Sequence, residues 1–347
     1  MDSSLALPPN LVGIITPSTA HTLSFLATTS YVGSLYLSQK LFNPKTPKQA
    51  KAKPINSNHD DGSAIPPISS TDDGDIGYEG NGPKPGSRDH PETMKRRMIA
   101  VIISTTLSLS SVYLTIKSLA KYSGNRSSII QSLTLLGLRL PNNNDNSKLL
   151  YQILPWTLAP ILMTGPLFAM LLDDDLPLIG NRYHGEGLLQ KLGRGYREFG
   201  LMELRNYAVG PITEELVFRS SILSVSILGG LSFSSMVFGT PLWFGIAHAH
   251  HALETFRKNG STKHAAIHAI LGCLFQLSYT TLFGWFASYL YLRTGSVLPP
   301  LTSHIFCNVM GIYLPSTAIA RQPKRRYLIW GSYLAGIAGF VWGLTRL

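Results

Sequence analysis

Eight apolar blocks dominate this chain, and they constrain its fold more than any other feature. A helix that crosses the hydrocarbon core of a membrane needs about 20 mostly apolar residues. The blocks lie near residues 11–37, 98–119, 150–172, 212–231, 233–252, 265–291, 296–316 and 327–345. Their lengths predict an all-α, polytopic membrane protein with about eight transmembrane helices.

The blocks differ in quality. Ser, Thr and His21 dilute the first, and the fourth and fifth are interrupted by Gly229, Gly230 and Pro241. Charged residues make up only 14% of the chain, against roughly 25% in an average soluble domain. The mean hydropathy is +0.12 even though the chain contains a long polar segment. The composition therefore favours a membrane protein over a soluble one.

That polar segment, residues 40–96, separates the first two blocks. It is rich in Pro, Asn, Ser, Gly and mixed charge, and it has too few apolar residues to offset the entropy of ordering a chain. We therefore expect three parts: an N-terminal transmembrane helix at 1–39, a disordered cytosolic loop at 40–96, and a membrane-embedded domain at 97–347.

Clusters of Lys and Arg set the expected orientation. They follow the first, fifth and seventh blocks, so eight spans bring all three clusters to one side, which the positive-inside rule assigns to the cytosol. Both termini then face the lumen. The basic loop after the second block is an exception. The formal net charge is +11. The basic residues do not form the stripe with interleaved aromatics that nucleic-acid binding requires, so we expect no nucleic-acid partner.

Residues 186–206 mix apolar and charged side chains in an amphipathic pattern. The members are Leu188, Leu189, Leu192, Phe199 and Leu201 on one side and Lys191, Arg194, Arg197 and Glu198 on the other. This pattern predicts a helix that lies at the cytosolic interface and leads into an acidic pair. An ordinary connecting loop is the alternative.

Ionisable side chains inside apolar blocks are the candidates for function, because each costs roughly 2.5–3.5 kcal/mol on insertion scales. They are Glu214, Glu215, Arg219, His248 and His304. The two adjacent glutamates diverge by about 100° on a helix, so we expect different roles for them. Glu215 and Arg219 are four residues apart and can pair on one face. That pairing leaves Glu214 free to carry a proton, although a purely structural ion pair is the alternative for Glu215 and Arg219.

Two histidines extend the constellation. His248 belongs to a residue type that exchanges protons near neutral pH, although a packing histidine is the alternative. His304 and Asn308 are four residues apart, and so project two hydrogen-bond donors from one helix face. Such a pair suits an oxyanion formed during peptide hydrolysis, and a polar pair between packed helices is the alternative.

Other chemistries lack their motifs. The sequence has no His-Glu-x-x-His zinc motif and no Gly-x-Ser-x-Gly elbow, and no Gly-rich phosphate loop. Its two cysteines, Cys273 and Cys307, lie inside apolar blocks and form no disulfide framework. A membrane-buried thiol resists ionisation, which disfavours Cys307 as a nucleophile.

The run Arg-Asn-Tyr-Ala-Val-Gly-Pro-Ile-Thr-Glu-Glu-Leu-Val-Phe-Arg at 205–219 resembles the signature of the CAAX prenyl endopeptidases. These are the type II CAAX proteases, or Ras-converting enzymes, within the ABI-type glutamate intramembrane proteases. The family pattern is Glu-Glu-x-x-x-Arg, Phe-x-x-x-His and His-x-x-x-Asn. Its three parts occur here in order over about 205–310, at Glu214/Glu215/Arg219, Phe244/His248 and His304/Asn308. Three short motifs in order are a specific signal.

The resemblance implies an eight-helix fold in the endoplasmic reticulum membrane, surrounded by lipid, with a catalytic cavity open to the cytosol. It implies removal of the last three residues from prenylated CAAX proteins such as Ras-like small GTPases, without a cofactor or metal. By position, Glu214 and His248 would activate water, and His304 and Asn308 would stabilise the oxyanion. Glu215, Arg219 and Phe244 would support the site.

Two other hypotheses stay open. Glu214, His248 and His304 could be the three protein ligands of a catalytic Zn²⁺. Buried Glu, His and Arg also line proton and substrate pathways in transporters. The second hypothesis is therefore a non-catalytic transporter or scaffold. One difficulty concerns the depth of the site residues in the membrane. Glu214 and His248 fall near the cytosolic face, which prenylated C-termini reach. His304, counted from the lumenal start of its block, lies at mid-depth or deeper. Helix tilt, or a shifted helix boundary near Pro299 and Pro300, would remove this difficulty.

Overall fold

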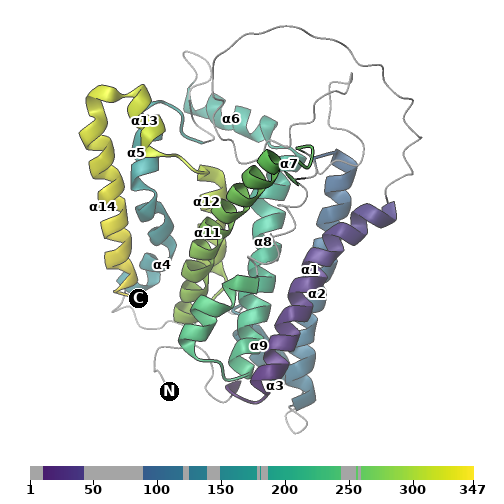
Figure 1. The fold of residues 1–347 in the computed structure, drawn as a ribbon. Coiled ribbons are helices and arrows are strands. Elements are labelled where there is room, and N and C mark those ends of the chain that lie inside the picture. The colour runs from purple at the N-terminus through teal and green to yellow at the C-terminus, as the bar shows by residue number, and fades with distance from the viewer. Residues whose placement is uncertain are drawn as a thin grey trace, which may run out of the picture.

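A computed structural model describes residues 11–42, 89–119, 125–138, 149–177, 180, 187–243, 255–256 and 259–347. These residues form helices and connecting turns and contain no strand, which confirms the predicted all-α class. Figure 1 shows the long helices side by side in a bundle.

The helical segments follow one another along the chain as α1 (Pro17–Phe42), α2 (Pro91–Leu119), α3 (Asn125–Leu135), α4 (Leu149–Leu162), α5 (Thr164–Leu172), α6 (Leu188–Glu198), α7 (Leu201–Leu204), η3 (Arg205–Val209), α8 (Gly210–Glu215), η4 (Leu216–Ser221), α9 (Ile222–Leu228), η5 (Ser235–Gly239), α11 (Lys263–Thr294), α12 (Leu298–Met310), α13 (Pro315–Arg321), η6 (Pro323–Arg325) and α14 (Arg326–Leu344). The segments η3, η4 and η5 are π-helical, and η6 is a 3₁₀ turn.

Three helices in the described ranges are long and apolar enough to cross a membrane, at 91–118, 263–294 and 323–344. The pair α4–α5, bent by 52°, makes a fourth if it is one span. These correspond to four of the eight predicted blocks. The other four do not pass the same test. Ser and Thr dilute α1, and α12 is too short. The block at 212–231 is divided by π-helical turns. Residues 244–252 of the block at 233–252 lie outside the described residues.

The segments from α7 to α9 form one continuous helical rod from Leu201 to Leu228, with η3 and η4 as wider turns within it. Pro211 accounts for η3, because its ring would clash with the carbonyl four residues back in a regular α-helix. Single π-turns inside helices occur frequently at functional sites. Both π-segments flank α8, which carries the acidic pair.

Helix α9 lies at the centre of the bundle, and its side chains are buried throughout. The chain just before α1 is fixed to it by two backbone bonds, from the Gly13 N–H to the Ile227 carbonyl at 3.3 Å and from the Ile15 N–H to the Leu228 carbonyl at 3.0 Å. The hydroxyls of Ser224 in α9 and Tyr291 in α11 both donate to the Leu135 carbonyl at the end of α3. These contacts hold the rod that carries the acidic pair.

The predicted amphipathic helix is present as α6, from Leu188 to Glu198. Figure 1 shows it lying across one end of the bundle, close to α7. Its apolar side chains are exposed, with Leu189 at 85% and Tyr196 at 83%, while Arg194 donates to the Gly180 carbonyl at 2.9 Å. The helix is therefore confirmed, and its place at a membrane interface stays a prediction.

Candidate active site

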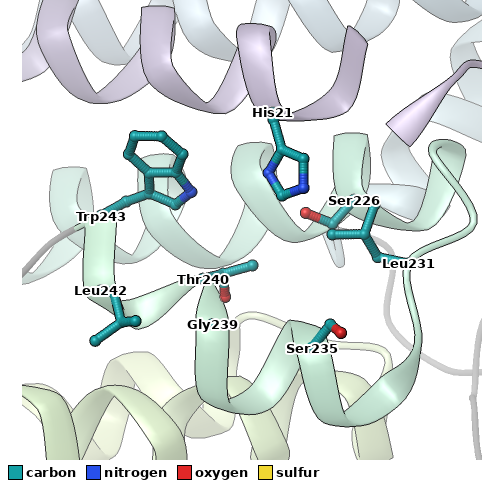
Figure 2. A pocket seen from close by; sticks show the side chains of 8 residues that line it. All are labelled: His21, Ser226, Leu231, Ser235, Gly239, Thr240, Leu242 and Trp243. Carbon is teal, nitrogen blue, oxygen red and sulfur yellow. The ribbon is translucent and has the colours of Figure 1, made fainter. Parts of the chain in front are cut away.

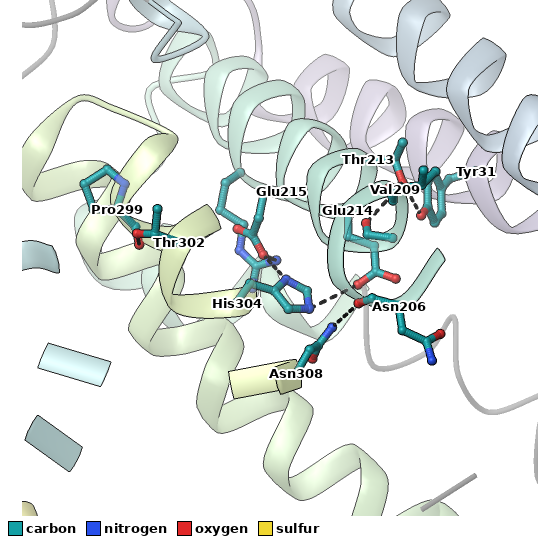
Figure 3. Close-up of polar contacts among 12 residues, drawn as sticks. Tyr31, Asn206, Val209, Thr213, Glu214, Glu215, Pro299, Thr302, His304 and Asn308 are labelled. Atoms are coloured by element: carbon teal, nitrogen blue, oxygen red, sulfur yellow. Dashed lines mark hydrogen bonds and ion pairs between the residues drawn. The ribbon is translucent and has the colours of Figure 1, made fainter. Parts of the chain in front are cut away.

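The candidate site lies where the turn that ends α8 meets the middle of α12 (Figure 3). Glu214 and Glu215 are the last two residues of α8, and Arg219 follows in η4. His304 and Asn308 project from α12. Two segments about 90 residues apart in sequence thus bring most of the predicted residues together.

Glu215 is the buried centre of this cluster. Its Oε1 accepts a hydrogen bond from Arg219 Nη1 at 3.0 Å and lies 2.7 Å from His304 Nδ1. The side chains of Glu215 and Arg219 are 0% and 3% exposed. A buried charge is tolerated when it is paired and hydrogen-bonded, so the ion pair that the four-residue spacing predicts is present. Within the described residues the second oxygen, Oε2, has no hydrogen-bond partner.

Glu214 occupies a different environment. Its side chain is 24% exposed, and its Oε2 lies 3.7 Å from His304 Nε2. His304 therefore faces Glu215 with one ring nitrogen and Glu214 with the other. Because the Glu215 oxygen already accepts from Arg219, we assign the Nδ1 proton of His304 to the contact with Glu215. The neighbouring glutamates differ in burial and in contacts, as the diverging side chains predict.

Asn308 is held by a residue that the sequence reasoning did not single out. Its Nδ2 donates to the backbone carbonyl of Asn206 in η3 at 2.9 Å. The Oδ1 of Asn206 accepts from Arg205 Nε at 2.9 Å, and Arg205 Nη1 pairs with Asp89 Oδ1 at 2.8 Å. The polar run before the acidic pair was visible in the sequence, but a backbone acceptor leaves no signal of its own.

Phe283 of α11 is the second residue that was missed. Its ring packs against the His304 ring, with centroids 4.9 Å apart, and the Arg219 guanidinium carbon lies 5.6 Å from its centroid. A guanidinium over an aromatic face is attracted by the ring quadrupole. In sequence, Phe283 is one aromatic residue among many in a long apolar helix, so no pattern could separate it from packing residues.

Helix α1 supports the acidic turn from behind. The Thr213 hydroxyl donates to the Val209 carbonyl at 2.7 Å. The Tyr31 hydroxyl therefore donates to Thr213 Oγ1, at 2.9 Å. The Tyr31 ring also meets Phe218 edge to face, with centroids 5.8 Å apart. These contacts fix α8 against the first helix of the bundle.

The structure places His304 beside the acidic pair, although its position in the predicted block put it deeper. Helix α12 begins at Leu298 and ends at Met310, six residues before the predicted block ends, with Pro299 and Pro300 in its first turn. The depth of this cluster in the membrane stays a prediction.

Phe244 and His248 lie outside the described residues. Their meeting with Glu214 therefore stays a prediction. Among the described ranges, no three or more His, Cys, Asp or Glu side chains are grouped so as to hold a metal ion. The zinc hypothesis depends on His248 and is not tested by that observation.

Comparison with known proteins identifies a family whose profile covers these residues. The sequence profile of the family described as Type II CAAX prenyl endopeptidase Rce1-like matches residues 197–310, which contain every residue of the cluster around Glu215. No solved structure matches the chain.

Curated relatives agree with the profile. The chain is 34% identical over 257 residues to CAAX prenyl protease 2 of Homo sapiens, covering 73% of this chain and 71% of that protein. It is 38% identical over 138 residues to CAAX prenyl protease 2 of Arabidopsis thaliana, covering 40% and 41%. It is 37% identical over 143 residues to the probable CAAX prenyl protease 2 of Schizosaccharomyces pombe, covering 41% and 51%. This membrane protein therefore belongs to the type II CAAX prenyl endopeptidase family.

Proposed function

We propose that this chain removes the C-terminal aaX tripeptide from prenylated CAAX proteins by hydrolysing the peptide bond after the prenylated cysteine. The observation that carries the proposal is His304, whose two ring nitrogens face a buried glutamate and a partly exposed one. That arrangement gives a fixed, polarised donor beside a carboxylate that water can reach.

Glu214 is the general base in this proposal. Its carboxylate is the more accessible of the two, and a base must lie within hydrogen-bond reach of the water it deprotonates. The water oxygen attacks the scissile carbonyl carbon while Glu214 takes its proton. The proton then passes to the amine of the departing tripeptide. The assistance of His248 rests on its motif and on the family.

His304 and Asn308 form the oxyanion site. When His304 is an imidazolium, its Nδ1–H donates to Glu215 and its second proton, on Nε2, can stabilise the oxygen that becomes negative in the transition state. Asn308 Nδ2 carries two protons, and only one is needed for its bond to the Asn206 carbonyl. The other is available to the same oxygen. Glu215 and Arg219 hold His304 and do not themselves meet the substrate.

We further propose eight membrane spans in the endoplasmic reticulum, with the cavity open to the cytosol and prenylated CAAX proteins, such as Ras-like small GTPases, as substrates. The support is the positive-inside pattern of the sequence. The end of α1 and the start of α2, which border the polar segment 40–96, lie at the same end of the bundle as α7 (Figure 1). The three-part division at 39 and 96 stays a prediction.

The test is cleavage of a farnesylated CAAX peptide by purified protein in lipid vesicles. Glu214→Gln keeps the size of the side chain and removes the base, so we expect turnover to fall by about 10²–10⁴-fold. Glu92→Gln is the matched control, because Glu92 pairs with Arg96 at the exposed start of α2; it should leave turnover unchanged. Normal turnover by Glu214→Gln would contradict the proposal.

A chelator arm of the same assay separates the zinc hypothesis. If Glu214, His248 and His304 bind Zn²⁺, prolonged chelation should abolish turnover and added zinc should restore it. We expect full activity after chelation, because Glu215 already occupies one ring nitrogen of His304 and the other faces the proposed base.

A further inference from the structure

A pocket lies away from the side-chain cluster around Glu215, between α1 and the segment that follows α9. Its volume is about 400 Å³ and it is lined by His21, Ser226, Leu231, Ser235, Gly239, Thr240, Leu242 and Trp243. His21, Ser235, Gly239 and Leu242 are exposed on the surface of the bundle, so the pocket opens sideways. Because α1 belongs to the first predicted transmembrane block, we expect that opening to face lipid.

The polar groups of this pocket define its chemistry. Ser226 and Thr240 donate their hydroxyl protons to the carbonyls of Ile222 and Met236, at 2.8 and 2.6 Å. Their oxygens therefore offer only acceptor lone pairs to an occupant. Figure 2 shows His21 pointing from α1 into the space near these two hydroxyls. In the described part of the chain, no hydrogen bond or ion pair of His21 is found.

A neutral histidine offers one donor and one acceptor. A ligand hydroxyl is the group that matches this set, because it can accept from the His21 N–H and donate to Ser226 or Thr240. The lining contains no Lys, Arg, Asp or Glu. A phosphate or carboxylate head would have no Lys or Arg partner there, and an ammonium head would have no carboxylate partner.

Apart from Ser235, whose hydroxyl oxygen accepts from the Ser232 hydroxyl at 2.9 Å, the remaining side chains of the wall are mostly apolar. Leu231, Leu242 and Trp243 line it, and Trp243 meets Phe25 of α1 edge to face, with centroids 6.0 Å apart. A few polar groups in a mostly apolar pocket of this size are typical of small-molecule sites. The hydrocarbon part of a lipid fits this wall, and its head fits the hydroxyl and imidazole groups.

The pocket shares a segment with the active site. Pro241 follows the pocket residue Thr240, and a Cβ atom added to Gly284 would lie 2.6 Å from the Pro241 Cβ and 3.6 Å from Arg219 Nη2. An occupant that packs against residues 239–243 would therefore brace the wall behind Arg219.

We propose that this pocket binds a neutral membrane lipid whose polar head is a single hydroxyl group, with the hydroxyl between His21 and the Ser226 and Thr240 oxygens. Sterols and diacylglycerols share this chemistry. The proposal goes beyond the peptidase function and does not depend on it.

The test is photolabelling of the full-length protein in phosphatidylcholine vesicles, with a diazirine sterol in one arm and a diazirine diacylglycerol in the other. At least one probe should label peptides from α1 and from residues 231–243, and that arm identifies the source. The unlabelled alcohol should compete, whereas its methyl ether, which cannot donate, should compete at least about fivefold less well, as expected for the loss of one hydrogen bond.

Two variants and a control complete the test. His21→Leu removes the polar partner, and Gly239→Leu narrows a pocket wall where an added Cβ meets no atom within 4 Å. Each should lower labelling by about fivefold or more. Gly331→Leu on α14 adds the same side chain at another open glycine and should leave labelling unchanged. Labelling that persists in Gly239→Leu, equal competition by the methyl ether, or displacement by a farnesylated peptide would overturn the proposal.

Discussion

At the scale of single residues, Glu214 and Glu215 are chemically identical neighbours with separable tasks. Glu215 is 0% exposed and contacts Arg219 and His304, whereas Glu214 is 24% exposed. Removing one partner of a buried ion pair is costly because the other charge stays buried and uncompensated. Stability should therefore depend on Glu215 far more than on Glu214.

We predict that Glu215→Gln lowers the free energy of unfolding by about 3–5 kcal/mol, while Glu214→Gln changes it little and lowers turnover by about 10²–10⁴-fold. Thermal unfolding in detergent and peptide cleavage, measured on the same preparations, check both halves. Equal loss of stability in the two variants would show that the buried network around His304 is not what holds α8 and α12 together.

At the scale of elements, one glycine sets how closely α11 approaches the active site. An added Cβ at Gly284 would lie 2.6 Å from the Pro241 Cβ, and Gly284 follows Phe283, whose ring packs against the His304 ring. A side chain here must push α11 away from Pro241. The aromatic support of His304 would move with it.

Gly284→Ala should therefore destabilise the protein by about 1–3 kcal/mol and reduce peptide turnover. Gly272→Ala is its matched control, on the same helix at a position where an added Cβ meets nothing within 4 Å. That control should be neutral or stabilising by up to about 1 kcal/mol, because alanine favours helix more than glycine does. Equal effects of the two substitutions would contradict a role for close packing at Gly284.

At the scale of the whole molecule, long apolar runs with charged ends could be placed from sequence to within a few residues. The blocks predicted at 265–291 and 327–345 appear as Lys263–Thr294 and Arg326–Leu344. The π-helical turns around α8 could not be predicted, because they depend on backbone register rather than apolar spacing. Within the site, the Glu215–Arg219 pair was predictable because both partners lie on one helix face. The contacts of Asn206 and Phe283 cross between elements and required the fold.

The arrangement of the whole bundle also predicts which connections share a side of the membrane. Eight spans place Ser261, just before α11, in the cytosol and Thr345, just after α14, in the lumen. Figure 1 shows the start of α11 and the end of α14 at opposite ends of the bundle. Single cysteines introduced by Ser261→Cys or Thr345→Cys, in a chain carrying Cys273→Ser and Cys307→Ser, report each side.

In sealed microsomes, a membrane-impermeant maleimide should label the cysteine at 261 at once and the cysteine at 345 only after detergent opens the vesicles. The parent chain without cysteine is the control for background, and cleavage of the farnesylated peptide confirms that each variant is folded. Labelling of both positions in intact vesicles would exclude an odd number of crossings between them. The helices α11, α12 and α14 could then not all span the bilayer, and the proposed eight-span topology would be wrong.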